Sequence, residues 1–386
     1  MTGPATPRSH TLPHFRELDG MRGLAALLVF FHHLCSATIF SNNWIPGILA
    51  LRSIFEFGTV GVDIFFVLSG FLITSLLLRD RADPAYYRHF YWKRALRILP
   101  VYVLCLLGVL LFIPHSSGYV LLSTFFIANF TNLFHVDPVG PFWSLAIEEQ
   151  FYLVWPTVLR RRSVQTISHW ALAIAAGSTL LRFAFAAVGH HNTILTFLHC
   201  DGLAIGALIA CRYEGAQRER RSLSSDDPIF VTALLAGFVL CAIPLVLLSS
   251  PSHVAIDFAL FQTGVTLICG SLIGLLIAHT GSKVLSPFRG RVLTFFGLIS
   301  YAFYMVHLYV MWGYDHLRGL IVPGDTRGYF IRLFAVFTLS IAVSLILRYL
   351  VELPALSLRK YVLTRPASKA ETASEAETEV PLLASQ

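Results

Sequence analysis

Apolar stretches long enough to cross a bilayer occupy most of this chain. A run of roughly 20 apolar residues forms a helix that spans the hydrocarbon core of a membrane. Only 13% of the 386 residues are charged and the mean hydropathy is +0.67, whereas a soluble protein carries about 25% charged residues. The chain is therefore predicted to be an all-α, polytopic membrane helix bundle. The candidate stretches are 18–40, 58–78, 97–113, 119–134, 143–159, 167–188, 195–212, 229–249, 255–279, 293–314 and 329–352.

The positions of the basic clusters predict how many of these stretches cross the membrane. Lys and Arg collect in cytoplasmic loops, and if the basic clusters all face inward, an even number of crossings separates Arg97 from Arg160. Three stretches lie between them, and 119–134 is the shortest and carries several Ser, Thr and Asn residues. We interpret it as a re-entrant or interfacial segment, since polar backbone at depth is tolerated where it lines a protein cavity. About ten transmembrane helices remain, with both termini cytoplasmic, in the plasma (cell inner) membrane.

The chain divides into three parts by composition. Residues 1–15 are polar and are expected to form a flexible N-terminus, without the charged start and short apolar core of a cleaved signal peptide. Residues 16–364 form the transmembrane domain. Residues 365–386, rich in Ala, Ser and Glu, are expected to be a disordered cytoplasmic tail. The net charge of +7 fits cytoplasmic loops next to membrane lipid, so no nucleic-acid partner and no metal site are expected.

Several ionisable side chains fall at one depth in the predicted bundle. They lie on six predicted helices, each five to seven residues from the expected outer end, which is roughly 8–10 Å at ~1.5 Å per residue. A charged group at this depth costs several kcal/mol unless it pairs or meets water. We therefore predict one polar chamber in the outer half of the membrane. Its residues are His33, Asp63, Glu148, Glu149, Arg182, Asp201 and His307.

A set of arginines lies near the predicted inner face. Arg94 and Arg97 are three residues apart and share a helix face, and forked guanidinium groups suit phosphate. The alternative is that they are ordinary positive-inside anchors. Arg22 and His33 are eleven residues apart, about 16 Å along one helix, so this helix reaches both regions. The pattern indicates a phosphate-bearing donor that enters from the cytoplasm, with a histidine as general base.

Motifs in the first third of the chain resemble those of the membrane acyltransferase-3 family, bacterial O-acetyltransferases that modify surface polysaccharides. The first, FRELDGMRGLAALLVFFHHL, places an Arg-x10-His pattern on Arg22 and His33. The second, GTVGVDIFFVLSGFLI, contains Asp63 and Ser69, and KRALRILP carries the family's Arg-x-x-Arg.

Further motifs follow in the same order as in the family. FWSLAIEEQFYLVWP is similar to its Trp-Ser-Leu-x-x-Glu motif, in which Glu148 matches the acid. CDGLAIGALIA matches an Asp-x-Leu-x-x-Gly stretch, and SYAFYMVH and VELPALSLRK look like its final-helix motifs. Together the motifs cover residues 16 to about 362.

The resemblance implies an acyl-CoA donor, with acetyl-CoA as the expected one, and a carbohydrate hydroxyl as acceptor, such as a cell-surface or periplasmic glycan. The residues expected to carry catalysis are His33, Glu148 and Arg22. Those expected to bind the donor are Arg22, Arg94 and Arg97. Those expected to line the substrate chamber are Asp63, Ser69, Trp143, Glu149, Arg182, Asp201 and His307. In this scheme Glu148 orients or charge-pairs the histidine, and Glu149, about 100° further around the helix, is placed to pair with Arg182.

Other readings stay open from the sequence. The acceptor could be a small secreted metabolite instead of a glycan. A proton-coupled transporter would also use buried acids and histidines, although such carriers usually show internal repeats and interrupted helices, which this sequence lacks. For single residues, the plainer alternatives are packing for His32, a capped polar network for His307 and a helix-start cap for Asp63. Coenzyme A binding would separate the enzyme from the transporter.

Overall fold

The computed structural model describes residues 14–36, 57–189, 194–247, 254–319 and 326–360. Every regular element in these ranges is helical, so the predicted all-α fold is confirmed for the part of the chain described. The α-helices are α1 (Arg16–Ser36), α3 (Val60–Asp80), α4 (Tyr86–Phe112), α5 (Ser117–Thr124), α6 (Phe142–Arg160), α7 (Val164–Ala187), α8 (Thr196–His199), α9 (Asp201–Glu219), α10 (Asp227–Leu247), α11 (Val254–Ala278), α12 (Arg291–Arg318), α13 (Thr326–Leu347) and α14 (Leu353–Ser357). A five-residue π-helix, η7 (Arg348–Glu352), joins α13 to α14.

Eight helical segments in the described ranges are long and apolar enough to cross a membrane, which confirms a multi-pass membrane protein. They fall on α1, α3, α4, α7, α10, α11, α12 and α13. Two helices counted among the ten predicted spans, α6 and α9, are 19 residues each and are not among these eight segments. The stretch 119–134 folds as the end of α5 and a 3-10 helix (Ala128–Phe134), each too short to cross.

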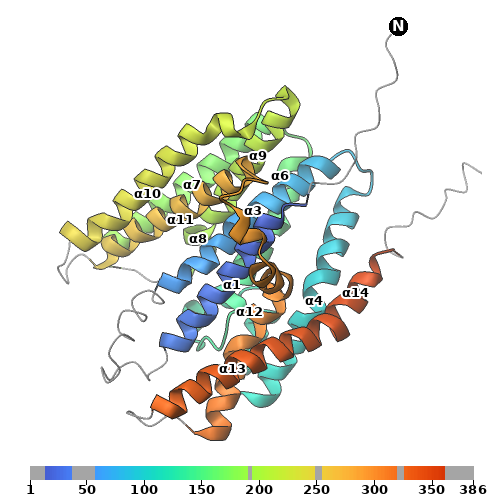
Figure 1. Ribbon diagram of the computed structural model, residues 1–386, viewed down its shortest axis with the longest axis vertical. Coiled ribbons are helices and arrows are strands. Elements are labelled where there is room, and N and C mark those ends of the chain that lie inside the picture. The colour runs from blue at the N-terminus through green and yellow to red at the C-terminus, as the bar shows by residue number, and fades with distance from the viewer. Residues whose placement is uncertain (1–13, 37–56, 190–193, 248–253, 320–325, 361–386) are drawn as a thin grey trace, which may run out of the picture.

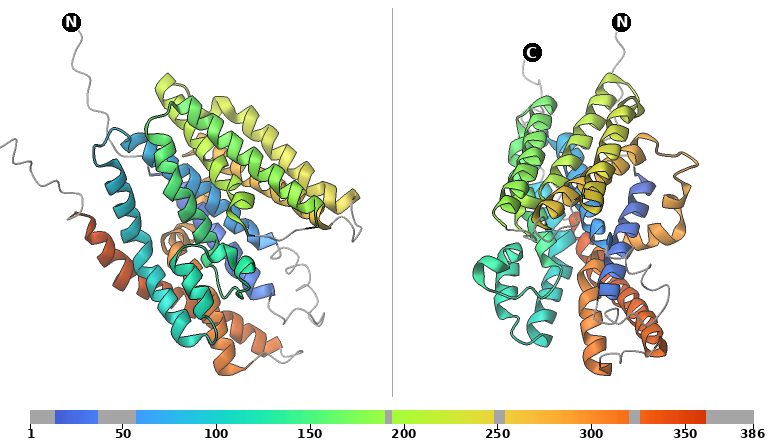
Figure 2. Two further views of the ribbon diagram at one scale, coloured as in Figure 1. Left: turned by 180° about the vertical axis from the view of Figure 1, so that it is seen from behind. Right: turned by 90° about the vertical axis from the view of Figure 1, so that its left-hand side faces the viewer.

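The helices form a bundle in which α1 and α3 run through the middle (Figure 1). Helix α1 packs along α12 and α3, and α3 packs along α9. Figure 2 shows α10 and α11, which pack on each other, at one edge, and α13 with α14 along the opposite edge. The central helices α1 and α3 therefore lie between the helices of the two edges.

Glycines let the central helices touch backbone to backbone. A Cβ atom at Gly23 of α1 would overlap the carbonyl oxygen of Leu293 on α12, and a Cβ atom at Gly206 of α9 would overlap the carbonyl oxygen of Val67 on α3. Small residues at such crossings are typical of helix packing in membranes. The close crossings fix how α1, α3, α9 and α12 are spaced, and these helices carry much of the site described next.

Candidate active site

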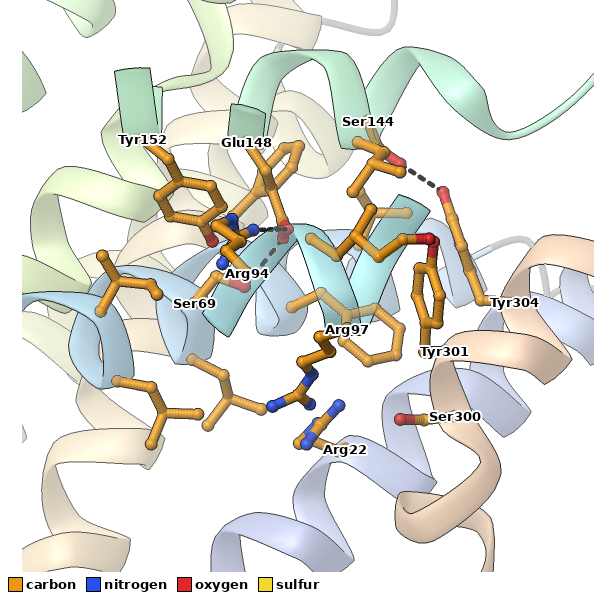
Figure 3. Close-up of a pocket in the computed structure, with 18 of the residues that line it drawn as sticks. Arg22, Ser69, Arg94, Arg97, Ser144, Glu148, Tyr152, Ser300, Tyr301 and Tyr304 are labelled. Carbon is orange, nitrogen blue, oxygen red and sulfur yellow. Dashed lines mark hydrogen bonds and ion pairs between the residues drawn. The ribbon is translucent and has the colours of Figure 1, made fainter. Parts of the chain in front are cut away.

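A first cavity, here named the arginine cavity, lies between α1, α3, α4, α6 and α12 (Figure 3). Its volume is about 150 Å³. Polar side chains gather in it from all five helices, although these helices are distant in sequence. The polar lining residues are Arg22, Ser69, Arg94, Arg97, Ser144, Glu148, Tyr152, Ser300, Tyr301 and Tyr304.

Two arginines of this cavity have no carboxylate partner. The guanidinium groups of Arg22 and Arg97 lie next to each other (Figure 3), and no ion pair joins either one to an acid in the described part of the chain. Arg22 is half-buried and Arg97 is exposed to the cavity. Like charges in close contact repel, and forked guanidinium groups bind carboxylate or phosphate well. The pair therefore forms a site suited to an anion.

Arg94 is already paired within the protein. Its Nε donates a hydrogen bond to Glu149 Oε1 at 2.9 Å, its Nη2 lies 3.7 Å from Glu148 Oε2, and its guanidinium stacks 3.3 Å from the ring centre of Tyr152. Ser69 donates a hydrogen bond of 2.8 Å to Glu148. The carboxylates therefore hold Arg94 in place, and the guanidinium supplies the opposite charge that buried acids need. Arg94 lines the arginine cavity with Arg22 and Arg97, and its role in binding the donor stays a prediction.

A second cavity, the histidine cavity, lies beside the first and has a volume of about 220 Å³. It combines an indole, imidazoles, a carboxylic acid and an amide. Gln262 of α11 donates a hydrogen bond of 2.7 Å to Asp63 of α3, which fixes the carboxyl group at the cavity. The polar and aromatic lining residues are His32, His33, Thr59, Asp63, Phe66, Trp143, His199, Phe258, Gln262 and Tyr304.

The two cavities share part of their lining. Val62, Phe66 and Tyr304 line both, so their side chains separate the arginines from the histidines. The hydroxyl groups of Tyr304 and Ser144 lie 2.6 Å apart in a hydrogen bond, which holds the tyrosine ring in this wall. A molecule bound in one cavity is thus one layer of side chains away from the other.

Several predicted chamber residues lie elsewhere than expected. The single chamber is wrong: Ser69 and Glu148 line the arginine cavity, whereas Asp63 and Trp143 line the histidine cavity. Equal depth does not imply a shared cavity, because residues at one level can point to different sides of a bundle. His33 lines the histidine cavity, and no hydrogen bond joins it to Glu148 among the described residues.

The predicted partner of Glu149 is also wrong. Glu149 pairs with Arg94, and Arg182 instead forms a buried ion pair with Asp201, with Nη2 and Oδ2 at 2.6 Å. Arg182 also donates to the carbonyl oxygen of Leu198. Both members of this pair are 4% exposed and line neither cavity, so the pair holds α7 to α9.

Comparison with known sequences adds to this geometry. A family model described as an acyltransferase domain, acyltransferase-3, matches residues 15–349. The chain belongs to this family. The match confirms the resemblance seen in the motifs, and it covers all the helices that line the two cavities.

Relatives in the acyltransferase-3 family include named O-acetyltransferases. "Putative O-acetyltransferase SACOL0978" of Staphylococcus aureus is 25% identical over 329 residues, which is 76% of this chain and 50% of the relative. Peptidoglycan O-acetyltransferase OatA of Listeria monocytogenes is 34% identical over 163 residues, 37% of this chain and 24% of the relative. The chain thus spans half or less of the length of these relatives. No solved structure matches it.

Sequence reasoning missed several residues of the site. Ser144 and Tyr304 stand inside two of the acyltransferase-3 motifs, so the motifs themselves carried a signal for them. His199 immediately precedes the motif CDGLAIGALIA. Gln262 lies in an apolar stretch without a motif, and only its hydrogen bond to Asp63 indicates a role. Among the described residues, no three His, Cys, Asp or Glu side chains gather as metal ligands would.

Proposed function

We propose that this protein is an integral-membrane O-acyltransferase that moves an acyl group, acetyl in the first instance, from acyl-CoA to a glycan hydroxyl. The observation that carries the proposal is the pair of adjoining cavities, one cationic and one lined by histidines, with a shared wall. The named relatives support O-acetyl transfer, and peptidoglycan is the acceptor named for one of them. We place the protein in the plasma membrane, with the arginine cavity toward the cytoplasm.

The arginine cavity is the donor site in this proposal. No acid among the described residues pairs with Arg22 or Arg97, so a phosphate of the donor supplies the negative charge. Arg94, held by Glu148 and Glu149, orients the wall of the site. The thioester end of the donor then points along α1 toward the wall formed by Val62, Phe66 and Tyr304.

The histidine cavity is the acceptor site. The indole of Trp143 offers an apolar surface for a sugar ring, and Asp63 offers oxygens to sugar hydroxyls. His33 takes the proton of the attacking hydroxyl as its oxygen bonds to the thioester carbonyl carbon. The carbon–sulfur bond then breaks and the thiolate of coenzyme A leaves, accepting a proton as free thiol. The products are the acylated sugar and coenzyme A.

Thiol release from acetyl-CoA tests the proposal. The purified protein in nanodiscs is given acetyl-CoA with and without peptidoglycan fragments, and acetylated glycan is measured by mass spectrometry. Acceptor-dependent thiol release that is lost in His33→Ala supports it, with Thr232→Ala, an exposed position on α10 away from both cavities, as control. Coenzyme A binding without glycan acetylation would redirect the acceptor to a small metabolite. Absence of coenzyme A binding would count against the enzyme and favour a transporter.

A further inference from the structure

His33 contacts a second histidine that is hidden behind it. The rings of His33 on α1 and His307 on α12 have their centres 5.1 Å apart. His33 Nδ1 lies 2.9 Å from the carbonyl oxygen of Val29 and 3.1 Å from His307 Nε2. His307 Nδ1 lies 2.7 Å from the carbonyl oxygen of Tyr304. His307 is 1% exposed and is not part of the lining of either cavity.

These contacts assign a proton to each ring. A carbonyl oxygen only accepts, so His307 Nδ1 carries the hydrogen that it donates to Tyr304. If the ring of His307 is neutral, its Nε2 then carries a lone pair and no hydrogen. His33 Nδ1 faces two acceptors, this lone pair and the carbonyl oxygen of Val29, so it carries a hydrogen as well. The remaining nitrogen of His33, Nε2, is left with the lone pair that a general base needs.

The surroundings of His307 favour the neutral ring that this assignment needs. Aromatic rings of Phe30 and Phe303 lie on it, with centres 6.2 and 6.4 Å away, and the ring of Tyr304 lies at 5.9 Å. A charged imidazolium without water or a counter-ion is costly in such a place. No carboxylate contacts either histidine in the described part of the chain. A neutral histidine thus takes the position that an acid occupies beside the histidine of many hydrolases.

We propose that His307 is a positioning residue: together with the carbonyl oxygen of Val29 it accepts from Nδ1 of His33, and so holds His33 in the tautomer whose Nε2 is the base of the acyl transfer. This rests on the proposed function only for the role of Nε2 as a base. When His33 Nε2 takes the acceptor's proton, the ring becomes cationic and its bond from Nδ1–H to His307 becomes charge-assisted and stronger. His307 therefore stabilises the transition state without taking a proton itself.

A matched pair of substitutions tests the positioning role through activity. The amide oxygen of His307→Gln reaches the place of Nε2 and accepts from His33, whereas the shorter His307→Asn reaches only the place of Nδ1. We expect His307→Gln to keep kcat within about tenfold and His307→Asn to lose about 10²- to 10⁴-fold in kcat, the range seen when an orienting partner is removed. KM for acetyl-CoA should be unchanged in both, because the arginine cavity is untouched. Equal loss in both variants would contradict the proposal.

The tautomer can be measured without any turnover. Nitrogen NMR of the full chain in nanodiscs, labelled at histidine, separates Nδ1–H from Nε2–H rings, and His33→Gln identifies the signal of His33. We expect His33 to be Nδ1–H in the parent and in His307→Gln, and a larger share of the Nε2–H form in His307→Asn, where only the carbonyl oxygen of Val29 still accepts from Nδ1. A parent His33 that carries its proton on Nε2 overturns the proposal, even if the protein proves to be an acyltransferase. If His33 has the expected tautomer but the protein shows no transferase activity, the hydrogen-bond geometry is supported and the proposed function is contradicted.

Discussion

At the residue scale, Arg94 and Arg97 differ in their partners although they lie one turn apart on α4. Arg94 is held by two carboxylates and the ring of Tyr152, whereas the guanidinium group of Arg97 lies next to that of Arg22 in the arginine cavity. Identical side chains therefore have different energetic roles. Removing Arg94 leaves acids without their counter-charge, and removing Arg97 relieves a repulsion between two cations.

This contrast predicts that one substitution lowers stability and the other weakens binding of the donor. Arg94→Gln should lower the free energy of unfolding by about 3 kcal/mol or more, because it leaves Glu148 and Glu149 unpaired. Arg97→Gln should leave stability nearly unchanged but raise KM for acetyl-CoA by about tenfold or more, since a charge-assisted hydrogen bond is worth roughly 1.5–3 kcal/mol. Thermal unfolding in detergent and thiol-release kinetics measure the two effects. Equal loss of stability in both variants would argue against the distinction.

Arg182 and Asp201 give a second residue-scale prediction. Their ion pair is buried and lines neither cavity, so its role is to hold α7 and α9 together. Asp201→Asn should cost about 3–5 kcal/mol, because it leaves the guanidinium buried without a counter-charge. Replacing both residues, as Arg182→Met with Asp201→Asn, should recover part of that loss. A double variant that is less stable than Asp201→Asn would contradict this role, as unfolding of the three proteins would show.

At the element scale, close backbone crossings fix the spacing of α1, α3, α9 and α12. Gly206 on α9 faces the carbonyl oxygen of Val67 and the backbone nitrogen of Phe71 on α3. Because α3 supplies Asp63 and Ser69, a shift of this helix changes both cavities at once. The position of a helix therefore matters for the chemistry even where its glycine touches no substrate.

A matched glycine pair tests this dependence. Gly206→Ala places a methyl group against backbone that cannot move without shifting α3, so we expect it to cost about 1–3 kcal/mol and to lower kcat. Gly177→Ala on α7 is the control, because a Cβ atom there meets no atom within 4 Å. Melting temperature and thiol release of both variants decide the point. Similar behaviour of the two would show that the α3–α9 crossing tolerates a larger spacing.

At the scale of the whole molecule, the bundle keeps an anion site and a histidine site apart by one layer of side chains. Phe66 and Tyr304 stand in this layer and line both cavities. In the proposed reaction the acceptor hydroxyl meets the thioester at this layer, and the surrounding side chains keep water away from it. The two sites come from helices that are distant in sequence, so only the assembled bundle has this property.

A smaller side chain in the layer between the cavities should uncouple thiol release from glycan acetylation. Phe66→Leu opens space between the cavities, so we predict that thiol release without acceptor rises relative to glycan acetylation. Leu72→Ala is the control, because Leu72 lines the arginine cavity alone. The ratio of free thiol to acetylated glycan, measured together, reports the coupling. An unchanged ratio in Phe66→Leu would mean that this side chain does not keep water from the donor.

The sequence by itself determined that the protein is helical, that it lies in a membrane, and that one helix, α1, carries both an arginine and a histidine of the site. Apolar runs and charge clusters are local signals, and the rise of a helix places Arg22 and His33 a known distance apart. The tertiary structure alone decided the partners: Glu149 with Arg94, Arg182 with Asp201, and His33 with His307. It also divided one expected chamber into two cavities. Depth along a helix follows from residue number, but the direction in which a side chain points depends on how each helix is rotated against neighbours from distant parts of the chain.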